Sequence, residues 1–108
     1  MKVLIVEDDA DMAELMMYAM RDHIPQTEVI VVMTCERALE ELRRDTGITL
    51  VFADSMGGDG YTVIKECLKL GIRVVACTGK ILDSPADICF VELLQKPFSL
   101  KELERFLS

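Results

Sequence analysis

Short apolar runs recur along the chain at intervals that leave room for a helix between each pair. The runs are VLIV at 3–6, VIVVM at 29–33, ITLVFA at 48–53 and VVAC at 74–77. Short runs that are apolar at consecutive positions are typical of strands covered on both faces, as in a parallel sheet. Strands alternating with helix-sized segments predict right-handed βαβ crossovers. The spacing therefore predicts an α/β fold with helices on both faces of a parallel sheet.

The segments between these runs show the helical period. Three amphipathic helices are predicted, the first capped by Asp9, the second capped by Thr34 and closed near Gly47, and the third closed by Gly71. A capping box, Ser99-Leu-Lys-Glu102, predicts a last helix. The predicted inward-facing residues are, in chain order, Met12, Leu15, Met16, Ala19 and Met20; Cys35, Ala38, Leu39 and Leu42; Val63, Ile64, Cys67 and Leu68; Leu100, Leu103, Phe106 and Leu107.

Residues 79–95 lack a clear period. Ser84-Pro85 favours at most a stub of helix, and the apolar stretch from Cys89 to Leu94 suits either a helical continuation or a fifth strand. We favour a strand near Phe90 to Leu94, with at most a stub of helix before it.

Length and composition limit the class of protein. The 108 residues suit one domain, 1–108, and the 51% hydrophobic content suits a packed core. No apolar run is long enough to span a membrane, and the start MKVLIVEDD is unlike a secretory signal, which predicts a cytoplasmic protein. A net charge of -7 argues against direct binding to nucleic acid.

The cysteines and the single histidine suggest no site of their own. Cys35, Cys67, Cys77 and Cys89 form no CxxC pair, so buried reduced thiols are predicted. His23 follows two charged residues at a predicted helix end, where a solvent-facing imidazole is expected.

Polar residues follow the predicted strands. Glu7 and Asp8 follow the first, Asp54 ends the third and Thr78 ends the fourth. The carboxyl ends of parallel strands share one edge of the sheet, so these residues are expected to converge. Taken singly, each has a structural interpretation, since acids favour helix starts and a strand-end hydroxyl often bonds to backbone. Asp59 and the neighbouring glycines likewise suit a helix cap and a tight turn.

VLIVEDD, an aspartate ending the third strand, a threonine ending the fourth, and LLQKPF before the last helix together resemble the receiver domain of two-component response regulators. The resemblance spans nearly the whole chain and implies a doubly wound, flavodoxin-like sheet of five strands in the order 2-1-3-4-5, with a fourth helix that is short or absent. It implies phosphorylation of Asp54 by a histidine kinase or histidine phosphotransfer protein. It also implies downstream effector proteins as partners, with no direct binding to nucleic acid or to a membrane. It leaves open whether the chain forms a homodimer. The implied site comprises Mg²⁺ ligands Glu7, Asp8, Asp54 and the Met56 carbonyl, with Thr78 and Lys96 contacting the phosphoryl group and a cis bond before Pro97.

Elementary electrostatics supports these roles. Two carboxylates about 4 Å apart repel by roughly 4 kcal/mol at an effective dielectric near 20, so three acids in one cleft need a cation. Mg²⁺ prefers oxygen ligands and takes one or two carboxylates plus a phosphate. A metal and a lysine supply the positioning and charge neutralisation that phosphoryl transfer requires. We therefore expect a phosphoacceptor switch that turns over no external substrate and is not an enzyme in that sense.

The sequence also departs from the receiver pattern. After Asp54 the family usually has D-x-x-M-P-x-x-D-G, whereas DSMGGDG is two residues shorter and lacks Met-Pro. Only 17 residues separate Thr78 from Lys96, and Leu93 stands where the family's switch aromatic usually lies. These departures support an alternative, a degenerate receiver that serves as a phosphorylation-independent interaction or dimerisation module.

Overall fold

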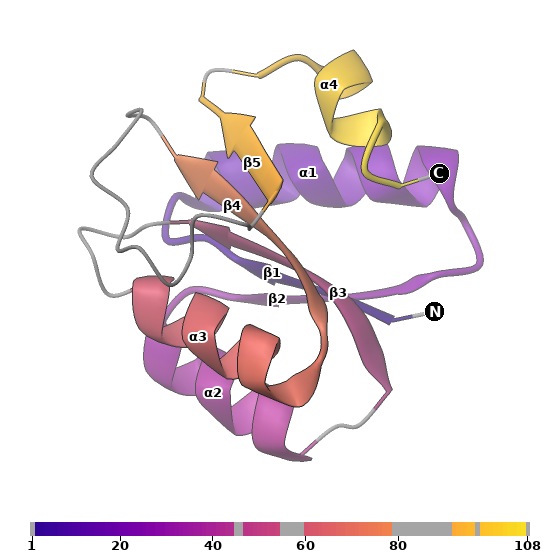
Figure 1. Ribbon diagram of the computed structural model, residues 1–108. Coiled ribbons are helices and arrows are strands. Elements are labelled where there is room, and N and C mark those ends of the chain that lie inside the picture. The colour runs from indigo at the N-terminus through magenta and orange to yellow at the C-terminus, as the bar shows by residue number, and fades with distance from the viewer. Residues whose placement is uncertain (1, 45–46, 55–59, 79–91, 97, 108) are drawn as a thin grey trace.

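Five parallel strands form one sheet in the order β2-β1-β3-β4-β5 (Figure 1). The computed structural model describes residues 2–44, 47–54, 60–78, 92–96 and 98–107. The predicted parallel sheet and its strand order are confirmed. The strands are β1 (Lys2–Val6), β2 (Glu28–Val32), β3 (Ile48–Asp54), β4 (Arg73–Thr78) and β5 (Glu92–Gln95).

Helices lie on both faces of the sheet, as predicted. In the described part of the chain they are α1 (Ala10–His23), α2 (Cys35–Arg44), α3 (Gly60–Leu70) and α4 (Leu100–Glu104). Helices α2 and α3 cover one face, and α1 and α4 cover the other (Figure 1). Among the described residues, no helix combines the length and apolarity needed to cross a bilayer.

Each face of the sheet contributes to its own core cluster. Along β1, Val3 and Ile5 belong to the cluster that includes residues of α1 and α4, whereas Leu4 and Val6 belong to the cluster that includes residues of α2 and α3. Successive side chains of a strand point to opposite faces, so a strand buried on both sides must be apolar at every position. This requirement explains the continuous apolar runs in the sequence.

The predicted N-terminal caps of three helices are confirmed. The Asp9 carboxylate accepts hydrogen bonds from the backbone N–H groups of Asp11 and Met12 at the start of α1. Thr34 caps α2, and Ser99 caps α4 by accepting from the N–H of Glu102. These side chains satisfy N–H groups that have no partner within the helix.

Three predicted inward-facing leucines are exposed instead. Leu15 and Leu68 are each 45% exposed, and Leu100 is 46% exposed. Leu15 lies about 100° around the helix from the buried Met16, at the edge of the apolar stripe, and Ala13 is buried as well. Leu68 lies similarly at the edge of a stripe centred between Ile64 and Cys67. Helix α4 and the turn after it contact the core through Leu103 and Leu107, which leaves its first residue in solvent.

The fifth strand is confirmed with shifted bounds. Its described part is Glu92–Gln95, so it ends one residue later than predicted. The predicted helical stub near Ser84, the question of a short fourth helix, and the residues Cys89 and Phe90 lie outside the described residues.

The predicted burial of the cysteines is confirmed for two of the three that the structure describes. Cys35 is half-buried, and Cys67 and Cys77 are buried. Burial raises the pKa of both buried thiols to about 12, so they are protonated and unreactive at neutral pH. His23 is exposed.

Candidate functional site

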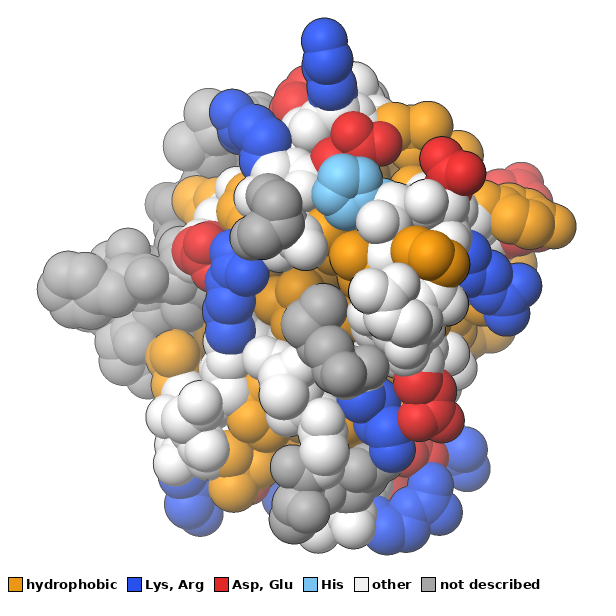
Figure 2. All heavy atoms as spheres, turned by 90° about the vertical axis from the view of Figure 1, so that its right-hand side faces the viewer, with side chains coloured by type: hydrophobic (Ala, Val, Ile, Leu, Met, Phe, Trp, Pro, Cys, Tyr) orange, Lys and Arg blue, Asp and Glu red, His pale blue; other side chains and the backbone are white. Residues whose placement is uncertain are grey.

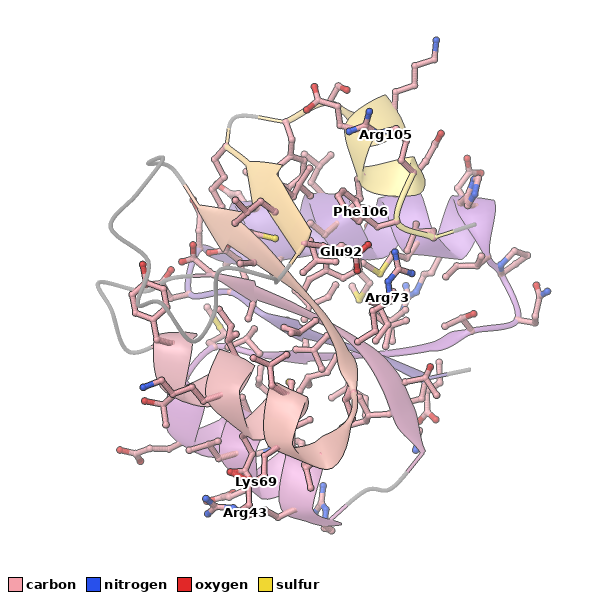
Figure 3. The ribbon with its side chains drawn as sticks, in the orientation of Figure 1. Arg43, Lys69, Arg73, Glu92, Arg105 and Phe106 are labelled. Carbon is pink, nitrogen blue, oxygen red and sulfur yellow. The ribbon has the colours of Figure 1, made fainter. Side chains whose placement is uncertain are left out.

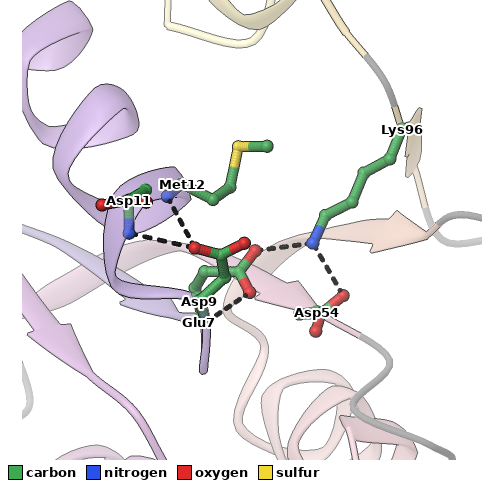
Figure 4. Close-up of polar contacts among 6 residues, drawn as sticks. All are labelled: Glu7, Asp9, Asp11, Met12, Asp54 and Lys96. Atoms are coloured by element: carbon green, nitrogen blue, oxygen red, sulfur yellow. Dashed lines mark hydrogen bonds and ion pairs between the residues drawn. The ribbon is translucent and has the colours of Figure 1, made fainter.

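Three strand ends bring charged side chains to one edge of the sheet (Figure 4). Glu7 follows β1, Asp54 is the last residue of β3, and Lys96 follows β5. Strand β1 pairs with β3, and β4 lies between β3 and β5. Lys96 must therefore extend its side chain across β4 to reach the acids.

The Lys96 ammonium donates to both carboxylates. Its Nζ lies 2.6 Å from Glu7 Oε1 and 3.1 Å from Asp54 Oδ1. The partners are 89 and 42 residues away in the sequence, so only the fold creates this contact. Charge-assisted bonds of this length are among the stronger hydrogen bonds in proteins.

Glu7 is the most deeply buried acid of the group. Its exposed fraction is 2%, and its second carboxylate oxygen, Oε2, accepts from the backbone N–H of Asp9 at 3.1 Å. Burial raises the pKa of Glu7 above its usual range, and the charge of Asp54 adds to the rise, although the bonds from Lys96 and Asp9 oppose it. A buried carboxylate is costly without a partner, and Lys96 supplies one.

The pKa of Lys96 is shifted by the same surroundings. Burial, the largest single influence, lowers the pKa of Lys96, but its hydrogen bonds to Glu7 and Asp54 and the charges of both acids together outweigh burial and raise it. The ammonium therefore stays charged at neutral pH. A fixed positive charge beside Asp54 suits the stabilisation of an anionic group.

Three acids at this edge offer a set of metal ligands. Glu7, Asp8 and Asp54 each present one carboxylate oxygen, and these oxygens all lie within 4.8 Å of one another. Glu7 is buried, Asp54 is half-buried and Asp8 is exposed, so the group extends from the core to the solvent-exposed surface. Carboxylate oxygens that remain open to water suit a hard divalent cation such as Mg²⁺.

The structure thus brings Glu7, Asp8, Asp54 and Lys96 together. Thr78 is the last residue of β4 and pairs with Gln95 of β5 in the ladder, but its side chain lies outside the described part. Met56, Asp59 and Pro97 also lie outside the described residues, so the predicted metal-binding carbonyl and the cis bond stay predictions.

Comparison with known proteins identifies the fold. The signal receiver domain of a DNA-binding response regulator from Colwellia psychrerythraea 34H matches 98% of this chain and 94% of its own chain, with a TM-score of 0.82 and 22% identity. The chain has the receiver fold. The N-terminal domain of a response regulator/sensory box/GGDEF protein from Carboxydothermus hydrogenoformans matches at 0.83 and 21%, over 99% of this chain and 90% of that one.

A third similar structure is a response regulator from Thermotoga maritima, with a TM-score of 0.70 and 22% identity over 98% of this chain and 93% of that chain. No protein-family model and no curated protein matches the sequence. At these identities the likeness establishes the receiver fold alone.

Sequence reasoning missed two features of this receiver fold. It assigned Glu7 only to metal binding, whereas Glu7 is also the closer partner of Lys96. It also missed the ion pair between Arg73 and Glu92, which are 19 residues apart on adjacent strands. Neither feature has a local signal, because each depends on which strands are neighbours and in which register they pair.

The surface charge on the side of the molecule that carries the N-terminus is mixed. Figure 2 shows that side, where acidic and basic side chains are interspersed over the described surface.

Proposed function

We propose that the protein is a phosphoacceptor signalling domain in which Asp54 takes a phosphoryl group from a phosphohistidine of a histidine kinase or histidine phosphotransfer protein. The proposal rests on one observation above all. An ammonium and three carboxylates, from segments far apart in the sequence, converge at the carboxyl edge of the sheet. The receiver fold makes this edge the expected place for chemistry.

The reaction would join the phosphorus to an Asp54 carboxylate oxygen. The N–P bond of the donor histidine would break, its electron pair would return to the imidazole, and an acyl phosphate would form on Asp54. Lys96, already 3.1 Å from Asp54 Oδ1, would contact a phosphoryl oxygen. Thr78 would offer its hydroxyl from the end of the neighbouring strand β4.

Mg²⁺ fits the acids of this site. Glu7, Asp8 and Asp54 would hold it, with the Met56 carbonyl as a further ligand, and the bound ion would neutralise charge on the carboxylates and the transferring group. Lys96 would compete with the ion for Glu7 and Asp54, because both carboxylates contact its ammonium and belong to the acidic group.

The domain would act as a switch and not as an enzyme with an external substrate. Its chemistry would be limited to its own phosphorylation and slow dephosphorylation. A change in charge at Asp54 would alter the contacts of the surrounding strand ends, and effector proteins would respond to that change.

The direct test is phosphorylation by a small phosphodonor. Incubation with Mg²⁺ and acetyl phosphate should add one phosphoryl mass, which should be absent from Asp54→Asn and from samples with EDTA. Asp11→Asn is the matched control, since Asp11 is an exposed acid of α1 outside the acidic group, and it should be phosphorylated normally. An adduct that persists in Asp54→Asn would refute the assignment.

One observation favours the alternative, a phosphorylation-independent interaction or dimerisation module. Lys96 already neutralises Glu7 and Asp54 through short contacts, so the edge can be stable without a metal. If neither Mg²⁺ binding nor an adduct is detected while the protein stays folded, the alternative replaces the phosphoacceptor function.

A further inference from the structure

Lys96 owes its position to the edge strand β5. The described part of β5 has four residues, and β4 is its partner in the sheet. Lys96 follows directly after Gln95, which is paired with Thr78. The register of β5 on β4 therefore determines whether the Lys96 ammonium reaches Asp54.

Hydrophobic packing alone defines that register poorly. Leu94 is 2% exposed and belongs to the core cluster of the α1/α4 face, whereas the adjacent Leu93 is 59% exposed. A slip of one residue would exchange these two identical side chains between the faces of the sheet. It would also move Lys96 by about 3.3 Å and turn its side chain to the other face. A second determinant must oppose this slip.

An ion pair at the start of β5 supplies that determinant (Figure 3). Arg73 Nε donates to Glu92 Oε2 at 2.7 Å, and Arg73 Nη2 donates to Glu92 Oε1 at 2.9 Å. Glu92 is paired with Val75, two residues after Arg73, so all three side chains lie on one face. The hydrogen bond from Arg73 lowers the pKa of Glu92 and keeps it charged. Two parallel bonds are geometrically specific, and a one-residue slip would break both.

The same arginine also fixes the chain beyond Lys96. Arg73 Nη1 donates to the backbone carbonyl of Phe106 at 3.0 Å, after the end of α4. The Phe106 ring packs edge-on against Phe52 of the central strand β3. Arg73 thus contacts the segment that carries Lys96 on both sides, at Glu92 before it and at Phe106 after it.

We infer that Arg73 and Glu92 are positioning residues, whose ion pair fixes the register of β5 on β4 and thereby holds the Lys96 ammonium beside Asp54. The inference deepens the proposed phosphoacceptor function, on which its activity readout rests. It assigns a role to two residues at the end of the sheet opposite to the acids.

The test compares Glu92→Gln with Glu28→Gln. The control breaks a cross-strand ion pair at the other edge of the sheet, where Lys2 Nζ lies 3.4 Å from Glu28 Oε2. With Glu92→Gln, phosphorylation of Asp54 by acetyl phosphate at saturating Mg²⁺ should slow by about threefold to fivefold, the range that the loss of an exposed ion pair allows. Mg²⁺ should bind as tightly or more tightly, because a displaced ammonium competes less for the carboxylates. Glu28→Gln should change neither quantity.

A charge exchange separates positioning from general destabilisation. Arg73→Glu alone should slow phosphorylation at least as much as Glu92→Gln, since it places two acids side by side. Adding Glu92→Arg to Arg73→Glu should recover part of the rate. A double variant no faster than Arg73→Glu would overturn the inference, as would a parental rate in Glu92→Gln.

Two measurements on the metal-free protein keep the inference testable if phosphorylation fails. In Glu92→Gln, the β5 amides should exchange with solvent hydrogen about threefold to fivefold faster, while the β2 amides keep the parental rate. The Lys96 ammonium protons should also exchange faster with water in NMR spectra, because they lose their fixed acceptors. Unchanged exchange at both groups would overturn the positioning role. A parent chain that is never phosphorylated, yet shows both changes, would refute only the phosphoacceptor function.

Discussion

We expect Lys96 to stabilise the fold and to compete with any metal ion that binds the acids beside it. Its ammonium compensates the buried Glu7 and the half-buried Asp54. Both acids also belong to the group that would hold a cation. If Mg²⁺ binds this group as proposed, the ion and the Lys96 ammonium would each neutralise the same carboxylates, so each would reduce the stabilisation that the other gives.

Replacement of Lys96 should separate these two effects. Lys96→Met keeps a long apolar stem but leaves Glu7, 2% exposed, without its ammonium partner. We expect the free energy of unfolding in EDTA to fall by about 1–3 kcal/mol, the cost of an unpaired buried polar group. Mg²⁺ should bind more tightly and restore most of the loss. Urea unfolding with and without Mg²⁺ measures both quantities.

Lys101→Met is the matched control for Lys96→Met. Lys101 is an exposed lysine of α4, so the control removes the same charge from the surface and should change stability by less than about 0.5 kcal/mol. Equal losses in both variants would mean that net charge, and not the contact with Glu7, determines the effect.

At the scale of the elements, the backbone conformation of Gly71 ends helix α3 before strand β4 begins. Gly71 has a φ of 72°, in the left-handed region. Its N–H bonds to the carbonyl of Leu68, and the N–H of Ile72 bonds to the carbonyl of Cys67. These two bonds form a Schellman motif, which satisfies helix carbonyls that would otherwise lack partners.

Substitution of Gly71 isolates the cost of this backbone conformation. No heavy atom lies within 4 Å of a Cβ built at this position, so Gly71→Ala adds no clash. We expect a loss of about 1–2 kcal/mol in the free energy of unfolding, from left-handed strain alone. Gly71→Asn should lose less, because asparagine tolerates this region better. Chemical denaturation distinguishes the variants, and equal losses in Ala and Asn would contradict a purely conformational cost.

The elements were predictable wherever a local rule governs them. The strand pattern, the cap at Asp9 and the stop at Gly71 each depend on neighbours a few residues away, and each is confirmed. Leu15 is exposed although the helical period predicts that it faces inward. A residue at the edge of an apolar helix face is buried only where another element packs against it. The pairing of Arg73 with Glu92 could not be predicted, since it depends on a β4–β5 register that neither residue encodes by itself.

At the scale of the whole molecule, the acidic charge is itself a constraint on folding. The chain carries 19 acidic and 12 basic residues, a net charge of -7. Three of the acids lie at one edge of the sheet within 4.8 Å of one another. Self-repulsion of this kind destabilises a compact state and is relieved by any cation that binds the folded chain alone.

Mg²⁺ should therefore stabilise the fold through this acidic group. At a free concentration of about 100 times the dissociation constant, binding to the folded state alone adds about 2.7 kcal/mol, which corresponds to a rise in Tm on the order of 10 °C. Asp8 is exposed, so Asp8→Asn should leave the metal-free Tm nearly unchanged and remove most of the rise. Asp11→Asn, which alters an exposed acid of α1 outside the group, should retain it. Differential scanning calorimetry in MgCl₂ and in NaCl of equal ionic strength separates binding from screening, since screening would raise the Tm of all three proteins alike.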